Sequence, residues 1–219
     1  MEKESVQFYT KNLARIALEI GAIQLNPENP FTWASGYRMP IYNDNRRLLG
    51  NAEHRLLVGR GMQTLLDQEN ISVDVIAGTA TAGIPPATTL ANILNRPLIY
   101  VRPQPKDHGM QNQIEGILKN RQNTVVVEDL VSTGGSALKA VEAIRQTGGT
   151  VTHCLCIFNY GFPEAAKAFE KANCHLLSLL TFLTLLQFAQ QGKNITPQQV
   201  DLLKDWYANP FEWGKNQFQ

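Results

Sequence analysis

Two adjacent carboxylates, Glu128 and Asp129, lie between an apolar run and a loop of hydroxyl and glycine residues. The run at 124–127 is β-branched throughout, so it predicts a buried strand. The loop at 132–136 reads Ser-Thr-Gly-Gly-Ser and leads into a helical pattern. Glycines let a backbone approach an anion closely, while hydroxyl groups and the N–H groups of a helix N-terminus donate hydrogen bonds to it. The segment therefore predicts a phosphate-binding site with two acids beside it.

The two acids restrict the kind of ligand. They would repel a phosphate unless they bound a divalent cation or accepted hydrogen bonds from sugar hydroxyls, so we expect a sugar phosphate handled with a metal. The loop lacks the Lys-Ser/Thr ending of a nucleoside triphosphate P-loop and the three spaced glycines of a dinucleotide-binding loop. A solvated strand end followed by an ordinary capped helix explains the acids alone or the loop alone, but it explains the joined pattern poorly.

A second polar loop, residues 102–116, follows another apolar run and carries the basic side chains Arg102, Lys106 and His108. Taken alone, it could be a solvated surface loop. Loops of this length in compact domains are usually functional or disordered, however. Because a pyrophosphate group needs cationic donors that a neutral glycine loop lacks, we expect these three side chains near the phosphate site.

Strands and helices alternate along the chain, which indicates an α/β fold. Apolar runs predict strands, and helical patterns predict helices, at 73–77, 85–94, 97–101, 124–128, 135–146 and 151–158. Such alternation favours a mostly parallel sheet flanked by helices. Ligands of these sheets bind beyond the carboxyl ends of the strands, so three loops should converge there: 78–83, 102–116 and 129–136.

The chain reads as a single domain over residues 1–219. Apolar residues recur at helical spacing from Leu13 to Ile20, which predicts an N-terminal helix that covers an apolar surface. We expect residues 1–50 to form this helix and a small hood, residues 71–175 the core sheet, and residues 176–219 a helical tail.

Composition excludes some partners. The 20 basic and 19 acidic residues leave a net charge of +1, which offers no global field for nucleic acid or an anionic membrane. No apolar run approaches the roughly 20 residues of a membrane span. The three cysteines are an odd count without the second pair of a zinc site, so we expect buried, reduced thiols and a cytoplasmic protein.

Residues 124–136 resemble the phosphoribosyl pyrophosphate (PRPP) signature of the phosphoribosyltransferases, which is an apolar strand, two acids, two apolar residues, and then hydroxyl and glycine residues. Residues 31–36 and 40–46 are similar to the base-binding segment of the orotate phosphoribosyltransferase branch of that family, and residues 100–116 to its mobile catalytic loop. The resemblance also includes residues 78–85 and the tail to 209–210, so it covers nearly the whole chain.

The resemblance implies a type I phosphoribosyltransferase-like (Rossmann-like) sheet with a small N-terminal hood that binds the base. It implies transfer of the 5-phosphoribosyl group from PRPP to orotate, which gives orotidine 5′-monophosphate and pyrophosphate. The Mg²⁺ that assists would be held through PRPP, without a firm direct protein ligand. Members of this branch are homodimers whose mobile loop reaches the neighbouring subunit's site, so a homodimer with a shared loop is also implied.

The resemblance further assigns roles to individual residues. It makes Lys106, His108 and Asp129 the expected catalytic residues. Ser132 is an expected contact to orotate for the same reason. The orotate carboxylate needs a cation or backbone donors, and Arg46 is our candidate from its segment, although it could equally be a surface arginine. The expected PRPP-binding residues are Arg102, Lys106, His108, Glu128, Asp129, Leu130, Val131, Ser132, Thr133, Gly134, Gly135 and Ser136.

The chain departs from the family pattern at three positions. Position 104 is Gln where related sequences commonly carry lysine, and Ala34 and Ala82 stand where some branches place lysines. Three alternatives therefore stay open: a phosphoribosyltransferase for another base, a PRPP-sensing regulator without catalysis, and a structural nucleotide-binding subunit. The regulator would be expected to carry a basic DNA-binding extension, which the near-neutral charge disfavours.

Overall fold

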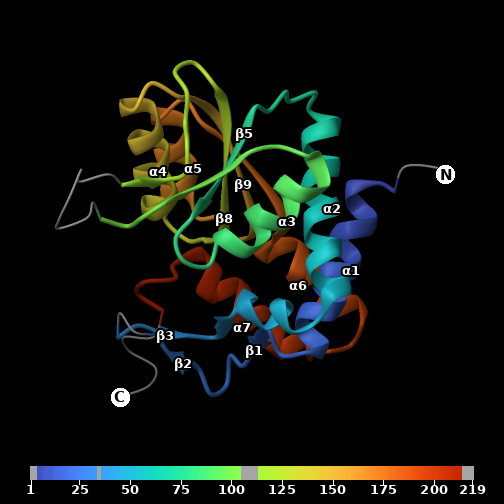
Figure 1. Ribbon diagram of the computed structural model, residues 1–219. Helices are drawn as coiled ribbons and strands as arrows, with labels where there is room; N and C mark the ends of the chain where they lie inside the picture. Colours follow the sequence, from blue (N-terminus) through green and yellow to red (C-terminus); the bar gives the residue numbers. More distant parts are fainter. Residues whose placement is uncertain (1–3, 34–35, 105–112, 214–219) are drawn as a thin grey trace.

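The computed structural model describes residues 4–33, 36–104 and 113–213, and these residues form a central six-stranded sheet (Figure 1). The strand order is β10-β9-β8-β5-β6-β7, and every neighbouring pair is parallel except β6 and β7. The strands are β5 (Val75–Thr79), β6 (Leu98–Val101), β7 (Ile114–Glu115), β8 (Asn123–Val131), β9 (Thr150–Asn159) and β10 (His175–Thr181). The predicted α/β fold with a mostly parallel sheet is confirmed.

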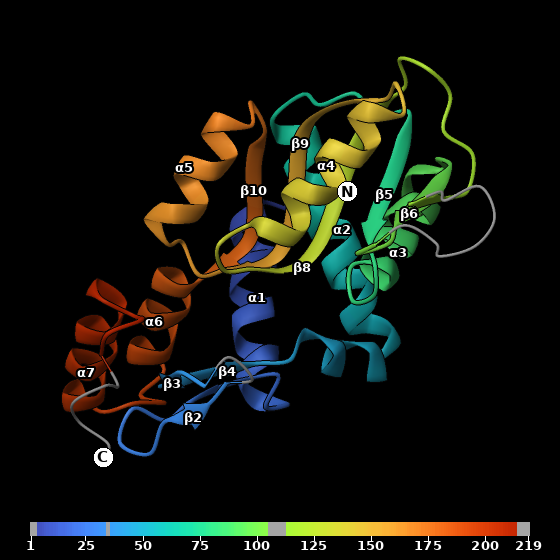
Figure 2. The same cartoon turned by 90° about the vertical axis from the view of Figure 1, so that its left-hand side faces the viewer.

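Helices cover both faces of the sheet, and each face has its own buried cluster (Figure 2). One face packs against α1 (Val6–Glu19), α2 (Ala52–Gln68) and α3 (Ile84–Leu94). The opposite face packs against α4 (Gly135–Gln146) and α5 (Pro163–Lys171). Because both faces are covered, the central strand β8 is a continuous buried run through residues 124–128 instead of an alternating pattern.

The acid pair lies where β8 extends beyond one of its neighbours. The register with β5 runs from Val75 opposite Thr124 to Gly78 opposite Val127. The register with β9 continues to Val131. Residues 128–131 are therefore paired on the β9 side only. The chain turns towards β6 after β5 and towards β9 after β8, so this gap is the topological switch point, where α/β sheets bind their ligands.

The hood is built from two small antiparallel ribbons. β1 (Ile23–Leu25) pairs with β4 (Ile41–Asn43), and β2 (Phe31–Thr32) pairs with β3 (Arg38–Met39). The 3₁₀ turn η1 (Asn45–Gly50) then connects the hood to α2. Two C-terminal helices, α6 (Phe182–Gln191) and α7 (Pro197–Ala208), lie beside the hood in Figures 1 and 2. Helix α1 and these ribbons lie in the segment for which the sequence predicts an N-terminal helix and a small hood.

An aromatic cluster joins the hood, the end of β9 and the two C-terminal helices. Trp206 is fully buried, and its ring lies 5.8 Å from Phe162 and 5.0 Å from Phe182, between centroids. Tyr160 stacks on Phe162 and also contacts Trp33 of the hood. Large apolar rings of this kind dominate core energetics, so the cluster holds the hood firmly over the carboxyl end of the sheet.

The expected helical tail from residue 176 is wrong over its first residues. Residues 175–181 form the edge strand β10, which pairs in parallel with β9 from His175 opposite His153 to Thr181 opposite Asn159. Helix begins only at Phe182. A short apolar run such as 176–180 has no periodicity that separates strand from buried helix. Pairing with β9 decides between them, and the sequence does not show that pairing.

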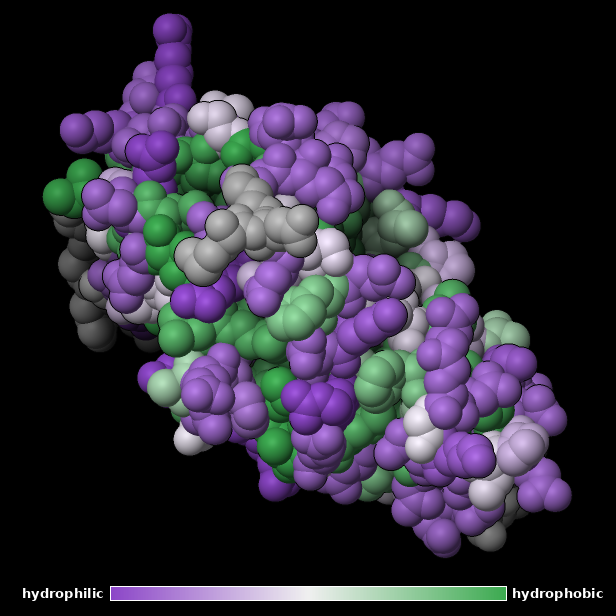
Figure 3. Space-filling view, turned by 90° about the vertical axis from the view of Figure 1, so that its right-hand side faces the viewer, coloured by the Kyte–Doolittle hydropathy of each residue, from purple (hydrophilic) through white to green (hydrophobic). Residues whose placement is uncertain are grey.

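The surface mixes polar and apolar side chains. Figure 3 shows small groups of apolar side chains among polar ones on the face turned to the viewer. Leu49 and Leu56 are large apolar residues that stay exposed, at 37% and 43%. Within the described residues, no helix has both the length and the apolar character that crossing a membrane requires. The three cysteines are buried and free, as predicted, and burial raises the pKa of Cys156 to about 12.

Candidate active site

Glu128 is a buried acid that joins three parts of the site. The residue is 5% exposed. One carboxylate oxygen accepts hydrogen bonds from the Thr79 hydroxyl at 2.8 Å and from the Asp129 backbone N–H at 3.0 Å. The other accepts from the Ser136 hydroxyl at 2.9 Å. Glu128 therefore connects the end of β5 and the first turn of α4 to β8, and it orders the loops around the cleft.

Asp129 is the acid that borders an open space. It lines a small cavity under the hood together with Arg46 and Ala82. Burial, and then the hydrogen bond and charge of Glu128, raise the pKa of Asp129 to about 7. Among the described residues this carboxyl group has no strong cationic partner, because Arg46 nearby is exposed and its charge is screened by water. This site would gain stability from a bound cation or from hydroxyl donors.

The loop at 132–136 has the shape of a phosphate cradle. Gly134 adopts a left-handed backbone with φ of 84° and begins α4 without a side-chain cap. A Cβ at Gly134 would also come within 2.7 Å of the Phe169 ring. Both the left-handed backbone and this close contact therefore favour glycine at position 134. At Gly135 an added Cβ would meet nothing within 4 Å. Gly135 and Ser136 line a cavity at the start of α4, where an anion could accept hydrogen bonds from the first N–H groups of the helix.

The loop at 78–83 lies tightly against β8. A Cβ at Gly83 would come within 2.4 Å of the Val127 carbonyl oxygen and 2.3 Å of the Thr79 hydroxyl oxygen. Gly83 also begins α3 without a side-chain cap, and Pro85 and Pro86 are the second and third residues of the helix. The N-termini of α3 and α4 thus lie at the same edge of the sheet, and their partial positive charges favour an anionic ligand between them.

A cavity of about 300 Å³ lies between the ends of β5 and β6 and the first turns of α4. Arg102 borders it and forms a 3.5 Å ion pair with Glu115. Gln104 and Lys139 border the same cavity, and within the described residues Lys139 has no ion-pair partner. The predicted convergence of the three loops is thus seen for their described residues. Lys106 and His108 lie outside the described residues.

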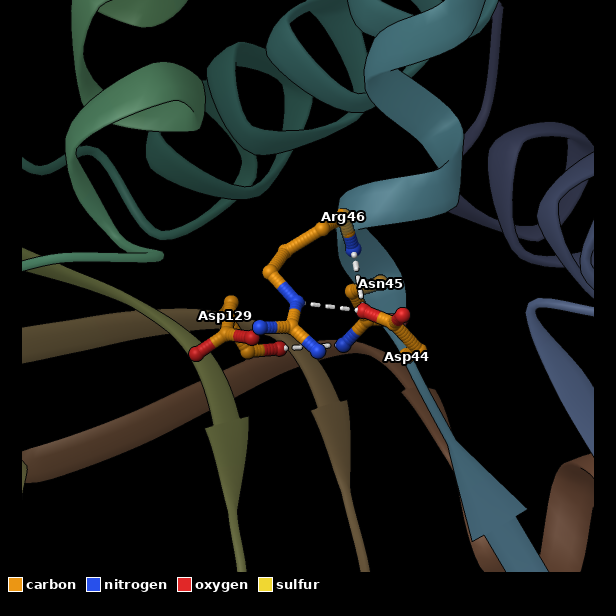
Figure 4. A network of polar contacts seen from close by, with 4 residues as sticks. All are labelled: Asp44, Asn45, Arg46 and Asp129. Carbon is orange, nitrogen blue, oxygen red and sulfur yellow. Dashed lines mark hydrogen bonds and ion pairs between the residues drawn. The ribbon is translucent and has the colours of Figure 1, made fainter.

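Arg46 lies at the edge of the hood and faces the acid pair. Its Nε donates to the Asp44 carboxylate at 2.6 Å, and that hydrogen bond lowers the pKa of Asp44. Figure 4 shows the guanidinium group between the carboxylates of Asp44 and Asp129. Beside it, the Asn45 side-chain N–H donates to the Asp129 backbone carbonyl at 2.7 Å. The arginine side chain is 65% exposed, so it has room to turn towards a ligand in the cleft.

The remaining predicted residues lie along one path from β8 to α4. Leu130 and Val131 are the last residues of β8, and Val131 is buried. Ser132 is half-buried, whereas Thr133 is exposed at the tip of the loop. Ala82 lines the small cavity, and Ala34 lies outside the described residues. The predicted set from 128 to 136 is therefore contiguous in space as well as in sequence.

Sequence reasoning assigned no role to Thr79, Asn45 or Lys139. Thr79 follows the apolar run of β5 and starts the small-residue loop. Its position at the carboxyl end of a strand therefore indicates a place in the site. Lys139 is one helical turn after Gly135, and helical side chains lean towards the N-terminus. Asn45 lies in the segment at 40–46 that resembles a base-binding segment, but no local pattern distinguishes it from its neighbours.

The acid pair does not form a metal centre from protein side chains. Within the described part of the chain, no group of three or more His, Cys, Asp or Glu side chains is placed to hold a metal ion. Asp129 is the acid of the pair that lines the small cavity, whereas both oxygens of Glu128 accept hydrogen bonds from protein donors. A divalent cation here would therefore take most of its ligands from a bound substrate.

Comparison with known proteins gives concordant matches. The model of the phosphoribosyl transferase domain family matches residues 48–177. The orotate phosphoribosyltransferase of Listeria innocua is 44% identical over 205 residues, which cover 94% of this chain and 98% of that protein.

Solved structures agree with the sequence relatives. The crystal structure of orotate phosphoribosyltransferase from Aeropyrum pernix matches with a TM-score of 0.70 at 33% identity, and covers 83% of this chain and 98% of that one. The Mycobacterium tuberculosis orotate phosphoribosyltransferase in complex with PRPP matches with a TM-score of 0.65 at 27% identity, over 81% of this chain and 98% of that one.

Proposed function

The chain belongs to the orotate phosphoribosyltransferase family, and from this premise we propose that it transfers the 5-phosphoribosyl group of PRPP to orotate. The products are orotidine 5′-monophosphate and pyrophosphate, in a step of pyrimidine nucleotide biosynthesis. The observation that carries the proposal is the acid pair at the switch point followed directly by an uncapped helix N-terminus, within a chain that matches its relatives over almost its full length.

In the reaction, a ring nitrogen of orotate forms a bond to the anomeric carbon while the bond from that carbon to pyrophosphate breaks. The nitrogen gives up its proton, and the leaving group carries away the electron pair. Positive charge develops on the ribose and negative charge on the pyrophosphate, so stabilisation of these charges is the main requirement. A strong general base is not required.

The loop at 132–136 holds the 5′-phosphate in this proposal. The open space over Gly135 and the uncapped N-terminus of α4 support that role. Asp129 accepts hydrogen bonds from the ribose hydroxyls, and its position beside the developing positive charge stabilises the transition state. Glu128 acts mainly by ordering Asp129 and Ser136, because protein donors already occupy both its oxygens. Leu130 and Val131 supply the strand end that sets the loop in place.

A bound Mg²⁺ would neutralise the pyrophosphate and polarise the ribose hydroxyls. The residues present fit such an ion, because Asp129 lines a cavity and has no strong cationic partner among the residues that the structure describes. Asp129 is therefore the residue that would hold the ion's shell from the protein side, and the other ligands would come from PRPP.

The leaving pyrophosphate is assigned to the basic loop. Arg102 borders the cavity next to the N-terminus of α4, which supports a role for its guanidinium group. Lys106 and His108 are proposed to close over the pyrophosphate and exclude water, which would otherwise hydrolyse the activated sugar. Gln104 contributes a neutral donor to the same cavity where related sequences carry a lysine.

Orotate is placed under the hood, next to Ser132 and Arg46. The exposed guanidinium of Arg46 faces the cleft from the hood, and this supports its assignment to the orotate carboxylate. Ser132 directly follows β8 and is the first residue of the loop that is proposed to hold the phosphate. Its hydroxyl is proposed to contact the base. We also assign the enzyme to the cytoplasm, since its three thiols are free and buried.

Four substrates tested in parallel provide the decisive assay. We expect PRPP-dependent pyrophosphate release with orotate, and none with uracil, adenine or hypoxanthine, measured at equal base concentrations with Mg²⁺. Release with uracil or a purine, but not with orotate, would reassign the base. PRPP binding by calorimetry without release for any base would favour the PRPP-sensing regulator instead.

A homodimer with shared sites is also proposed, and mixing of inactive chains tests it. Lys106→Ala and Asp129→Ala chains should each be inactive alone. If the loop of one subunit serves the acids of the other, exchanged subunits form one working site in each mixed dimer, and about a quarter of wild-type activity returns. Each variant incubated with itself is the control. Absence of recovery, with subunit exchange shown by mass spectrometry, would place the loop and acids in one chain.

A further inference from the structure

Asn45 is a buried polar residue of the hood that contacts the acid pair directly. The residue is only 4% exposed, and its Nδ2 donates to the Asp129 carbonyl oxygen at 2.7 Å across 84 positions of sequence (Figure 4). Within the described residues, this is the one hydrogen bond that joins the hood to β8. Apolar packing also joins the two halves of the site, but their direct polar contact at the acid pair is this single amide.

The backbone on both sides of this amide is itself held in place. The Asp44 N–H donates to the Ala22 carbonyl at 2.7 Å, and the Asp44 carboxylate accepts from the Arg46 N–H at 3.3 Å. Leu48, three residues further on, is buried in the core at 2% exposure. Asn45 thus projects from a fixed turn, so its amide has little freedom to move away from β8.

The acceptor needs this partner because of its place in the sheet. β8 loses its β5 neighbour after Val127, so the backbone at Asp129 has no strand on that side. A buried carbonyl without a partner is costly, and the amide of Asn45 satisfies this one. In a strand, the direction of a side chain follows from the orientation of its peptide units. A fixed Asp129 carbonyl therefore also fixes the direction of the Asp129 Cα–Cβ bond, from which the carboxylate projects.

We propose that Asn45 is a positioning residue for the transfer reaction: through its hydrogen bond to the Asp129 carbonyl, it aims the Asp129 carboxylate at the ribose from the base-binding hood. This inference rests on the proposed function, in which Asp129 serves the ribose and residues 31–46 serve the base. It also makes Asn45 the physical link between the two substrates, because any displacement of the hood by the base is transmitted to the carboxylate.

Two substitutions separate this role from simple packing. Asn45→Asp keeps the size of the side chain but replaces the N–H donor with an acceptor that repels the carbonyl. Asn45→Ala removes the donor and leaves space. We expect kcat/KM for PRPP to fall about tenfold in Asn45→Ala and further in Asn45→Asp. A role in packing alone predicts a lower Tm in both variants, with kcat/KM and PRPP affinity of the folded protein unchanged.

Binding without turnover provides a second readout. PRPP with Mg²⁺ and no base, titrated by calorimetry, should bind to each variant more weakly than to wild type. For each variant, the loss of affinity should be similar to its fall in kcat/KM. The matched control is Asn51→Ala in the same segment, because Asn51 caps α2 by accepting from the Glu53 N–H at 2.7 Å. This control should lower Tm by about 3 °C and leave the PRPP affinity unchanged.

The outcomes are distinguishable. If the wild-type protein is inactive with orotate, the proposed function is overturned, but the hydrogen bond from Asn45 to the Asp129 carbonyl is not in question. An active wild type, together with variants that keep wild-type kcat/KM and PRPP affinity, overturns the role of Asn45. If Asn45→Asp does not fold, Asn45→Ala still decides, because an unchanged PRPP affinity in that variant contradicts the proposal.

Discussion

Replacement of Asp129 by Asn is expected to lower kcat/KM for PRPP by roughly 10²- to 10³-fold. The amide keeps the shape of the side chain but loses the charge that, in the proposed mechanism, holds the metal shell and accepts hydrogen bonds from the ribose. Charge-assisted hydrogen bonds are about twice as strong as neutral ones, so about half of each bond's strength is lost with the charge. Steady-state kinetics with saturating orotate measures the change. Asp205→Asn on the exposed surface of α7 is the control, and should behave as wild type.

The same substitution has a second consequence for the free protein, which depends on pH. The folded pKa of Asp129 is about 7, above its ordinary value of 3.8, so the folded state binds the proton more tightly than the unfolded state. The stability from that proton is fully present below about pH 4 and is lost as pH rises to about 7. The amide of the Asp129→Asn variant does not titrate, so the variant should gain stability relative to wild type over this range.

Denaturant unfolding of the ligand-free proteins measures this difference. Above about pH 7.5 the Asp129→Asn variant is expected to be more stable than wild type by about 1 to 3 kcal/mol, and near pH 4 the two should converge. A more stable but inactive variant is the pattern of a residue retained for function at a cost in stability. A pH-independent difference would show that Asp129 is not held in a charge-disfavouring environment.

Replacement of Gly83 by Ala should destabilise the fold by about 2 to 4 kcal/mol and lower Tm by roughly 5 to 15 °C. The added methyl group would lie 2.4 Å from the Val127 carbonyl oxygen, far inside normal contact. Since that oxygen belongs to the backbone of the central strand, α3 itself must move away from β8. Calorimetric or denaturant unfolding measures the loss, and PRPP binding should weaken with it because the 78–83 loop shifts.

Gly135→Ala is the matched control for this effect. The same methyl group at Gly135 would meet nothing within 4 Å, so Tm should stay within about 2 °C of wild type. PRPP affinity should nevertheless fall, because the methyl group enters the space over the N-terminus of α4 where the phosphate is proposed to lie. Equal stability losses in the two variants would contradict the packing described here, and unchanged PRPP affinity in Gly135→Ala would move the phosphate elsewhere.

Much of this site was predictable because its residues are contiguous in the sequence. The apolar run, the two acids and the glycine loop occupy positions 124–136, and each has a local physical meaning that does not depend on the rest of the chain. The alternation of strands and helices then places the other loops at the same edge of the sheet, since parallel strands all end on one side. The edge strand β10 escaped this reasoning because its run of apolar residues carries no periodicity.

The sequence by itself thus determined the fold class, the phosphate loop and the class of ligand, because short-range pattern and composition encode them. Tertiary structure alone decided which of the two acids is enclosed. Glu128 turns towards Thr79 and Ser136, while Asp129 faces the cleft with a pKa of about 7 and with its carbonyl bound by Asn45. Those differences depend on burial and on partners 49 and 84 positions away, and side chains so distant in sequence are brought together only when the whole sheet and its hood are packed.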